Sequence, residues 1–326
     1  MSTERELWFM GPRRVEIRQG VSLPALVAGQ VKARALCSGI SQGTELLLYR
    51  GEGPHSFDSS LDAPSAPLYP RRYGYSWVGE VVDSRAEGIE PGQRLFALRP
   101  HGDVHVVGAG QFRVLPAAVP SPRATLAANL ETALNVVWDA GIALGDDVVV
   151  LGGGVVGLLA AWLAKRAGAS HVHLVEPSPR RRQAAVALGA DCVVAPDQDQ
   201  PHANADVVIE ATGQPASLDS AIMHAGEEAT VVVASFYGER RSPVSLGDSF
   251  HRRRLRLLAS QVSRLPPGKA PRWDVNRRWE RVQEFLSDDR LDGLLDPPVP
   301  LAEAPDLFAR LARDASTSLQ VTLDYG

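Results

Sequence analysis

The chain has 326 residues, which suits two domains better than one core. Its hydrophobic content of 44 % and charged content of 22 % are ordinary for a globular protein, and a formal net charge of −4 gives no support to nucleic-acid binding. No apolar run is long enough to span a bilayer, and the polar start Met1–Glu6 is not a signal peptide. We therefore predict a cytoplasmic protein with no membrane or nucleic-acid partner.

Residues 1–120 are predicted to be mostly β-structure, because short apolar runs alternate with Gly, Pro and Asp. The Pro- and Ser-rich stretch 51–71 predicts a surface loop, and residues 123–140 predict one or two helices. From residue 146 onward strands and helices alternate, which favours an α/β fold with a doubly wound parallel sheet. The predicted strands are 148–151, 171–175, 192–194, 206–210, 229–235 and 255–260, and the predicted helices are 155–166, 179–188, 215–225 and 275–287, before a last strand at 318–324.

A glycine-rich turn lies at the centre of this pattern. Gly152, Gly154 and Gly157 follow the predicted buried strand Val148–Leu151 with G-x-G-x-x-G spacing and begin a helix. Such a turn lets the backbone approach a pyrophosphate, while the helix N-terminus offers free N–H groups to it. Glu176 ends the next strand, about 20 residues later, where a carboxylate accepts hydrogen bonds from a ribose 2′-OH. The pattern predicts a Rossmann dinucleotide-binding domain.

Motifs along most of the chain resemble those of the medium-chain dehydrogenases/reductases. Residues 35–51 are similar to the family's A-G-I-C-G-T-D loop, residues 74–82 to G-H-E-x-x-G-x-V, residues 91–96 to P-G-D-R-V, and residues 211–213 to A-T-G. The resemblance implies a Rossmann domain at 130–262 and a β-rich, GroES-like catalytic domain formed by 1–129 and 263–326. It also implies a homodimer.

Zinc-dependent members of that family hold a catalytic zinc ion with a Cys, a His and a later Cys or Glu. The matching positions here are occupied by Ser41, Tyr75 and Ala128, which are poor zinc ligands. Cys37 is predicted to be a small core residue, and His105, which alternates with apolar residues, to lie on an exposed strand face. The remaining candidate ligands are His101, His105, Glu45 and Glu131. We predict no bound metal and no zinc cofactor.

The resemblance places five candidate catalytic residues near the reacting atoms. Tyr75, at a metal-ligand position, is a candidate proton donor or oxyanion partner, the alternative being that it fills the space left by zinc. Thr44 matches a hydroxyl that relays protons in zinc relatives, and Glu45 lies beside it. Either could instead cap a helix, because residues 41–45 precede an apolar run. Ser41, at the position of the family's Cys, completes the set. His101 follows a strand that lines the substrate pocket in the family, and it can titrate near neutral pH; the alternative is a satisfied loop histidine.

The resemblance also implies a set of cofactor-contacting residues. Thr132 is similar to the residue that contacts the nicotinamide, and Val156 to the one that packs against its ring. The full set is Thr132, Gly152, Gly154, Val155, Val156, Gly157, Glu176, Arg181, Ala211, Thr212, Gly213, Ser235, Phe236, Ser260 and Gln261. Glu176 favours NAD(H), because its carboxylate repels a 2′-phosphate. The neighbouring arginines at 180–182 could partly reverse that preference towards NADP(H).

Without a metal, we predict hydride transfer from NAD(P)H to a polarised C=C, as in quinone oxidoreductases and enoyl-thioester reductases, or to a C=O of a small organic molecule. The basic run 252–256 could bind an acyl-CoA thioester or be a solvated face. The motifs S-G-I-S-x-G-T-E and Y-G-Y also resemble those of bacteriochlorophyllide hydroxyethyl dehydrogenases, so a secondary-alcohol dehydrogenase is the alternative. A non-catalytic NAD(P)H-binding sensor is the second alternative.

Overall fold

The computed structural model describes residues 4–20, 23–53, 68–201 and 203–326. Most of the loop predicted at 51–71 falls outside these residues. The chain divides into two compact units, which we call unit 1 (Met1–Ala128 with Leu295–Gly326) and unit 2 (Asn129–Leu294).

Unit 1 is built mainly from antiparallel strands, as predicted. A hairpin is formed by β1 (Arg5–Gly11) and β2 (Arg14–Gln19). A seven-stranded sheet follows the order β14-β15-β3-β4-β5-β7, with β6 also paired to β3. Its strands are β3 (Gln30–Gly39), β4 (Trp77–Ser84), β5 (Arg94–Ala97), β6 (Val104–Gly108), β7 (Phe112–Val114), β14 (Val299–Pro300) and β15 (Thr322–Asp324). The last strand is shorter than the predicted 318–324, because Gln320 makes only an isolated bridge, to Leu295.

The core of unit 1 lies where the hairpin meets α1 (Thr44–Arg50) and α9 (Ala304–Arg313). Apolar residues recur at helical spacing along α9, so one of its faces is buried. On that face the Phe308 ring packs edge-on against Phe9 of β1, with the ring centroids 5.3 Å apart. The remaining helical pieces of this unit are α2 (Ser121–Ala124) and η2 (Leu301–Glu303).

Unit 2 contains a six-stranded parallel sheet with the order β10-β9-β8-β11-β12-β13. The strands are β8 (Asp147–Leu151), β9 (His171–Val175), β10 (Cys192–Val194), β11 (Ala205–Glu210), β12 (Ala225–Val233) and β13 (Arg256–Ala259). The strand order reverses between β8 and β11, which is the point where a doubly wound sheet binds its ligand. The predicted α/β fold is confirmed, although β12 begins at Ala225 instead of 229.

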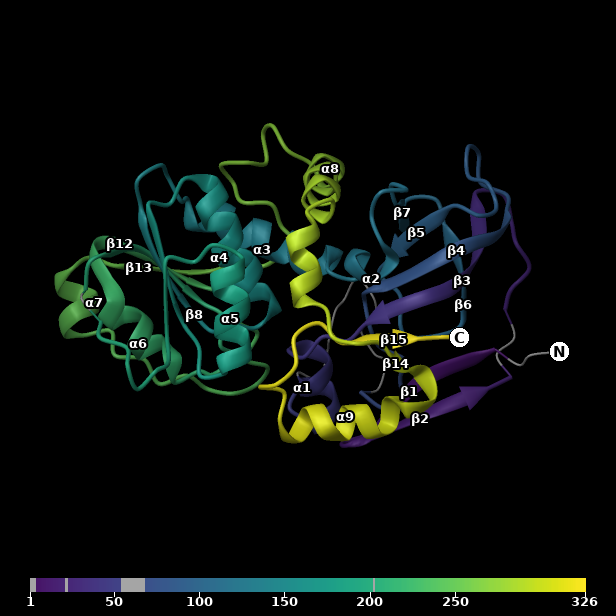
Figure 1. The fold of residues 1–326 in the computed structure, drawn as a ribbon, viewed down its shortest axis with the longest axis horizontal. Helices are drawn as coiled ribbons and strands as arrows, with labels where there is room; N and C mark the ends of the chain where they lie inside the picture. The colour runs from purple at the N-terminus through teal and green to yellow at the C-terminus, as the bar shows by residue number, and fades with distance from the viewer. Residues whose placement is uncertain (1–3, 21–22, 54–67, 202) are drawn as a thin grey trace. The chain divides into compact units, whose positions relative to one another are not determined.

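Helices cover both faces of this sheet (Figure 1). The helices from residue 127 to the end of the unit are α3 (Ala127–Ala140), α4 (Val155–Ala167), α5 (Pro179–Ala187), α6 (Ser217–His224), α7 (Asp248–Arg252) and α8 (Val275–Leu286), followed by η1 (Asp289–Leu294). The middle of α4 is buried without a break from Gly157 to Ala164, which explains why its sequence is apolar nearly all round. Within the described part of the chain, no helix is both long and apolar enough to cross a membrane.

Residues 263–294 pack with unit 2, whereas the sequence prediction assigned them to the other domain. The reason is a set of buried contacts made by α8. The Arg278 side chain is 6 % exposed and donates from Nε to Glu131 of α3 at 3.2 Å. On the same helix, Phe285 packs edge-on against Trp162 of α4, with centroids 5.6 Å apart. The sequence predicted a helix at 275–287 but not the surface against which it packs.

His105 is buried, contrary to the predicted exposed strand face. Its ring packs edge-on against Trp77, with centroids 4.9 Å apart, and its Nε2 lies 2.8 Å from the Pro100 carbonyl oxygen. Burial lowers the pKa of His105 to about 4. The imidazole is therefore neutral at pH 7 and donates from Nε2 to Pro100. Alternation failed as a guide here because β6 is covered on both faces.

Arg278→Ala should lower the free energy of unfolding by about 3 kcal/mol, because it removes the buried donor shared by Glu131 and the Val262 carbonyl. Arg281→Ala is the matched control on the same helix. Its ion pair with Glu284 is exposed and worth less than about 0.5 kcal/mol. Urea unfolding followed by circular dichroism measures both variants. Equal losses for the two would contradict the buried role of Arg278.

The His105 pKa predicts a loss of stability in acid. The folded pKa of about 4 lies below the unfolded value of about 6.5. Between these values the unfolded chain binds more protons, so the stabilisation is complete above pH 6.5 and is lost as the pH falls towards 4. The loss amounts to about 3 kcal/mol at pH 4. Unfolding curves of His105→Gln should lack this component, while the exposed control His171→Gln keeps it.

Candidate active site

Two reciprocal hydrogen bonds brace the turn that leads into α1. The Ser41 hydroxyl accepts the Thr44 N–H at 3.2 Å, and Oε1 of Glu45 accepts the Ser41 N–H at 2.9 Å. Helix capping was the alternative for Thr44 and Glu45; the structure has Gly43 as the N-cap of α1, with no side-chain bond to it, and Glu45 closes the turn before it. This hydrogen bond occupies only one of the two Glu45 carboxylate oxygens.

The other oxygen of Glu45 pairs with His101. Oε2 lies 2.8 Å from Nε2 of His101, and the two side chains are 0 % and 1 % exposed. The His101 ring lies against Gly74, where an added Cβ would come within 3.0 Å of Nε2. Gly74 also has a φ of +127°, a conformation that side chains disfavour. The structure thus joins two residues that the sequence named separately into one buried pair.

Two further residues extend this pair, and sequence reasoning missed both. The Ser38 hydroxyl lies 2.7 Å from Nδ1 of His101 and 2.6 Å from the Tyr325 hydroxyl. The Tyr325 oxygen in turn accepts the Gly102 N–H at 3.2 Å. No sequence signal pointed to these residues, because Ser38 and Tyr325 lie 287 positions apart. We call the series Glu45, His101, Ser38 and Tyr325 the buried relay.

Tyr75 lies beside the buried relay and is partly buried against the core of unit 1. Burial raises the pKa of its phenol, hydrogen bonds from Ser41 and Thr44 oppose that rise, and the negative charge of Glu45 adds to it. The phenol therefore stays protonated at neutral pH, with two hydroxyls placed to stabilise the phenolate. The structure thus brings all five predicted catalytic residues, Ser41, Thr44, Glu45, Tyr75 and His101, into one cluster.

The donor set in this cluster does not match zinc. The three positions that bind zinc in the family hold Ser41, Tyr75 and Ala128. Cys37 is buried in β3, and burial raises the pKa of its thiol to about 12. Among the residues that the structure describes, no group of three or more His, Cys, Asp or Glu is arranged to hold a metal ion.

In unit 2 the glycine turn joins β8 to α4, and two of its three motif glycines leave no room for a side chain. Gly152 has a φ of +98°, and an added Cβ would lie 2.7 Å from the Ala211 carbonyl oxygen. At Gly157 a Cβ would lie 1.9 Å from the Gly152 oxygen, whereas at Gly154, the N-cap of α4, it would meet nothing within 4 Å. The first and third glycines therefore shape the turn, while the second leaves open space at the helix N-terminus, beside Val155 and Val156. Such space is what a pyrophosphate requires.

Glu176 is held rigidly at the end of β9. Its side chain is buried, with the residue 3 % exposed, and its two oxygens accept the Gly153 N–H at 2.7 Å and the Ser178 N–H at 2.8 Å. Each carboxylate oxygen has a second lone pair, so a ribose hydroxyl can still donate to it. Arg181 follows at the start of α5, where its N–H donates to Ser178.

The remaining predicted cofactor residues lie at the carboxyl ends of neighbouring strands. Ala211, Thr212 and Gly213 follow β11, Ser235 and Phe236 follow β12, and Ser260 and Gln261 follow β13. Because parallel strands end at one edge of a sheet, these segments share that edge with the glycine turn. Thr132 lies in α3, and Phe236 is 51 % exposed. The Ser260 hydroxyl donates to Asp139 of α3 at 2.7 Å, which ties that strand end to the helix.

Sequence reasoning missed a buried carboxylate at this edge. Glu210, 0 % exposed, accepts the Thr212 N–H at 2.8 Å and the Tyr237 hydroxyl. Arg240 donates to the Gly213 carbonyl at 2.7 Å and so joins the loops after β11 and β12. The sequence did contain a signal for this residue, because Glu210 ends a predicted strand and directly precedes the A-T-G motif at 211–213.

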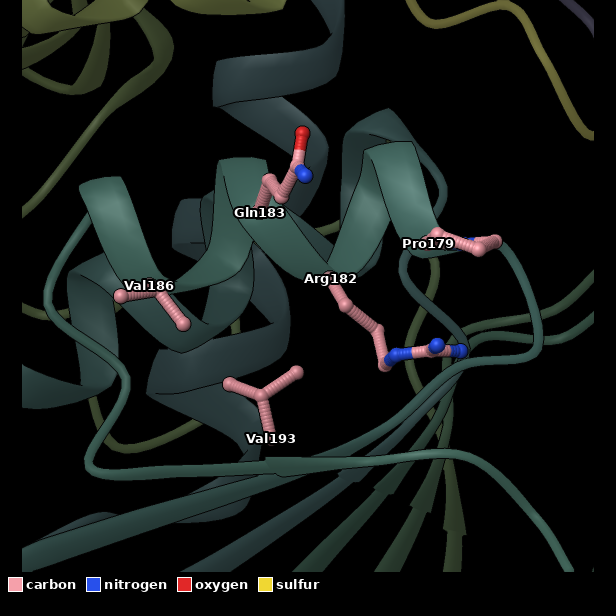
Figure 2. Close-up of a pocket in the computed structure, with 5 residues that line it drawn as sticks. All are labelled: Pro179, Arg182, Gln183, Val186 and Val193. Atoms are coloured by element: carbon pink, nitrogen blue, oxygen red, sulfur yellow. The ribbon is translucent and has the colours of Figure 1, made fainter.

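A hollow of about 370 Å³ lies against α5 and β10 (Figure 2). It is lined by Pro179, Arg182, Gln183, Val186 and Val193. None of these is a predicted cofactor residue, and the Arg182 guanidinium donates to the carbonyls of Glu176 and Pro177. The hollow does not coincide with the glycine turn.

Comparisons with known proteins agree with this geometry. The family model described as zinc-binding dehydrogenase matches residues 155–275. (R,R)-butanediol dehydrogenase of Bacillus subtilis strain 168 is 30 % identical over 253 residues, covering 65 % of this chain and 72 % of that one. The chain belongs to the medium-chain zinc-binding dehydrogenase family. The family predicted from the sequence is therefore confirmed. The zinc-independent subgroup is taken up below as a proposal.

Other members of the family match over longer stretches. D-guloside 3-dehydrogenase of Escherichia coli strain K12 is 27 % identical over 312 residues, covering 87 % of this dehydrogenase and 89 % of the relative. 2-Desacetyl-2-hydroxyethyl bacteriochlorophyllide A dehydrogenase of Cereibacter sphaeroides is 29 % identical over 244 residues, covering 70 % and 73 %. The crystal structure of 2R,3R-butanediol dehydrogenase from Bacillus subtilis has the same fold, with a TM-score of 0.80, 19 % identity and coverage of 99 % and 100 %.

Two glycine variants distinguish the glycine that shapes the turn from the glycine that leaves room for the cofactor. Gly157→Ala should lower the free energy of unfolding by about 3 kcal/mol, because its Cβ meets backbone that cannot move aside. Gly154→Ala should fold normally but bind NADH more weakly, because its methyl group occupies open space at the helix N-terminus. Thermal unfolding and quenching of NADH fluorescence measure the two effects. Normal NADH binding by Gly154→Ala would place the pyrophosphate elsewhere.

Proposed function

We propose that this protein is a zinc-independent dehydrogenase that oxidises a secondary alcohol to a ketone with NAD⁺, or catalyses the reverse reaction. The observation that carries the proposal is the Tyr75 phenol, which meets the Ser41 and Thr44 hydroxyls and the charge of buried Glu45. It occupies a position where zinc-dependent relatives have a metal ligand. A phenol there can exchange a proton with the substrate oxygen instead of polarising it with a metal.

The reaction divides into a hydride and a proton. Bound nicotinamide supplies the hydride acceptor or donor. In the reducing direction Tyr75 gives its proton to the carbonyl oxygen of the substrate, while Ser41 and Thr44 donate hydrogen bonds to the phenolate that remains. In the oxidising direction the phenolate takes the proton of the substrate hydroxyl. Glu45 makes that phenolate a stronger base, because its charge raises the pKa of the phenol.

The comparisons favour alcohol oxidation over C=C reduction. The relatives described above are named as dehydrogenases of butanediol, of a guloside at position 3 and of a hydroxyethyl side chain, all of which are secondary alcohols. Reduction of an enoyl thioester or quinone, our main prediction from the sequence, gains no such support. In the basic run considered for a CoA thioester, Arg252 pairs with Asp248 and Arg254 with Glu228 on the exposed surface. We propose a small polyol or sugar derivative as the substrate.

Glu176 supports NAD(H) as the cofactor. Its carboxylate is buried and held by two backbone N–H groups, so it cannot swing aside to admit a 2′-phosphate. Arg182 donates to backbone carbonyls, which leaves it poorly placed to neutralise such a phosphate.

The decisive experiment measures NAD⁺ and NADP⁺ reduction by EDTA-treated protein with a panel of polyols, glycosides and simple secondary alcohols. NADH oxidation with ketones, enoyl-CoA thioesters and quinones runs beside it. We expect turnover of an alcohol–ketone pair with NAD(H). Alcohol oxidation should rise with pH until the Tyr75 phenol ionises, above the ordinary value of about 10. Tyr75→Phe should lower kcat by about 10²- to 10⁴-fold.

Tyr49→Phe is the control, because that ring packs against Phe308 in the core of unit 1. Activity that EDTA abolishes and zinc restores would overturn the zinc-free mechanism. Turnover confined to enoyl thioesters or quinones would overturn the choice of substrate. Full activity of Tyr75→Phe would remove the phenol from the chemistry.

A further inference from the structure

The buried relay has a direction that can be worked out from its donors and acceptors. The Gly102 N–H can only donate, so the Tyr325 oxygen accepts from it. The Tyr325 O–H then needs an acceptor, and the described contacts of this hydroxyl offer one, the Ser38 oxygen at 2.6 Å. Ser38 must accordingly direct its own proton to Nδ1 of His101 at 2.7 Å.

This direction determines the protonation of His101. An Nδ1 that accepts a hydrogen bond carries no proton, so the proton of a neutral imidazole lies on Nε2. Nε2 faces Oε2 of Glu45 at 2.8 Å, while Oε1 accepts the Ser41 N–H. Both carboxylate oxygens therefore receive donors, which stabilises the ionised form of a group that is 0 % exposed.

The opposite direction of these hydrogen bonds would leave one buried donor without an acceptor. If Nδ1 carried the proton and donated to Ser38, Ser38 would donate to Tyr325. The Tyr325 O–H would then be left without an acceptor among the contacts that the structure describes, in a residue 7 % exposed. A buried hydroxyl without a partner is strongly disfavoured. Ser38 and His101 are 0 % and 1 % exposed, so bulk water cannot replace either partner.

We propose that Ser38 and Tyr325 are positioning residues that hold His101 in the neutral form with its proton on Nε2, and thereby keep Glu45 ionised beside Tyr75. The consequence for catalysis rests on the proposed function, in which Tyr75 exchanges the proton. The assignment of the proton on His101 does not depend on it. Neither residue touches the reacting atoms; both act through His101.

Nitrogen NMR of protein labelled in its imidazole rings tests the assignment without substrate. The signals of His101 are identified by their absence in His101→Gln. We expect a non-protonated Nδ1 and a protonated Nε2 at neutral pH. Ser38→Ala removes the hydrogen-bond donor to Nδ1 of His101. Tyr325→Phe removes the hydroxyl that donates to Ser38, so the Ser38 oxygen becomes free to accept a proton from Nδ1. In both variants His101 should no longer be confined to the form with its proton on Nε2. Ser38→Thr keeps a hydroxyl and should restore it, and Ser84→Ala controls for loss of a serine elsewhere in the same sheet.

Kinetics separate a positioning role from simple damage to the fold. In Ser38→Ala and Tyr325→Phe, kcat for alcohol oxidation should fall about tenfold, the effect of one lost hydrogen bond, with KM for NAD⁺ unchanged. Oxidation should also level off at a lower pH than in the wild type, because a less charged Glu45 raises the pKa of Tyr75 less. Ser38→Thr should recover both values.

Two results would overturn the proposal: a wild-type His101 protonated on Nδ1, or wild-type nitrogen signals in Ser38→Ala. An unchanged pH profile in Ser38→Ala would overturn its catalytic part. If no alcohol is oxidised by any form of the protein while the NMR prediction holds, the proposed function fails and the proton assignment is supported.

Discussion

A carboxylate that is removed from water stays ionised only where hydrogen-bond donors surround it, and the functional turns of both units are built on this requirement. Glu45, Glu176 and Glu210 are 0 %, 3 % and 0 % exposed. Each accepts a backbone N–H from the turn beside it, namely that of Ser41, Gly153 and Thr212. Loss of any of these carboxylates would leave backbone donors unpaired as well as remove a charge, so turn shape and local electrostatics are coupled.

In unit 1 the same carboxylate serves two purposes. One oxygen of Glu45 shapes the turn before α1, and the other holds His101, while its charge acts on Tyr75. The helix-capping and catalytic interpretations of the sequence are therefore compatible. Where zinc-dependent relatives concentrate positive charge on a metal, this cluster contains a phenol, two hydroxyls and a buried negative charge. This difference in chemistry is the basis of the zinc-independent reaction that we propose.

The accuracy of the sequence predictions depended on how local the evidence was. The glycine turn, Glu176 and the alternation of strands and helices are local patterns, and they correctly predicted the parallel sheet and the glycine turn that joins β8 to α4. His105 shows where such patterns fail: alternation predicts an exposed side only when one face of a strand meets water, and Trp77 covers that side here. The position of α8 was missed for a similar reason, since a helix predicted from local sequence does not identify the surface against which it packs.

The sequence by itself determined the fold class, the dinucleotide turn and the residues at the zinc-ligand positions, because each depends on spacing within a short segment. Only the tertiary structure decided that Glu45 meets His101, that Ser38 and Tyr325 complete the relay, and that Glu210 holds the turn after β11. These contacts join residues as far as 287 positions apart, and Tyr325 reaches Ser38 because β15 pairs with β3. The side chains that satisfy a buried polar group are selected by strand pairing and helix packing, which no local pattern encodes.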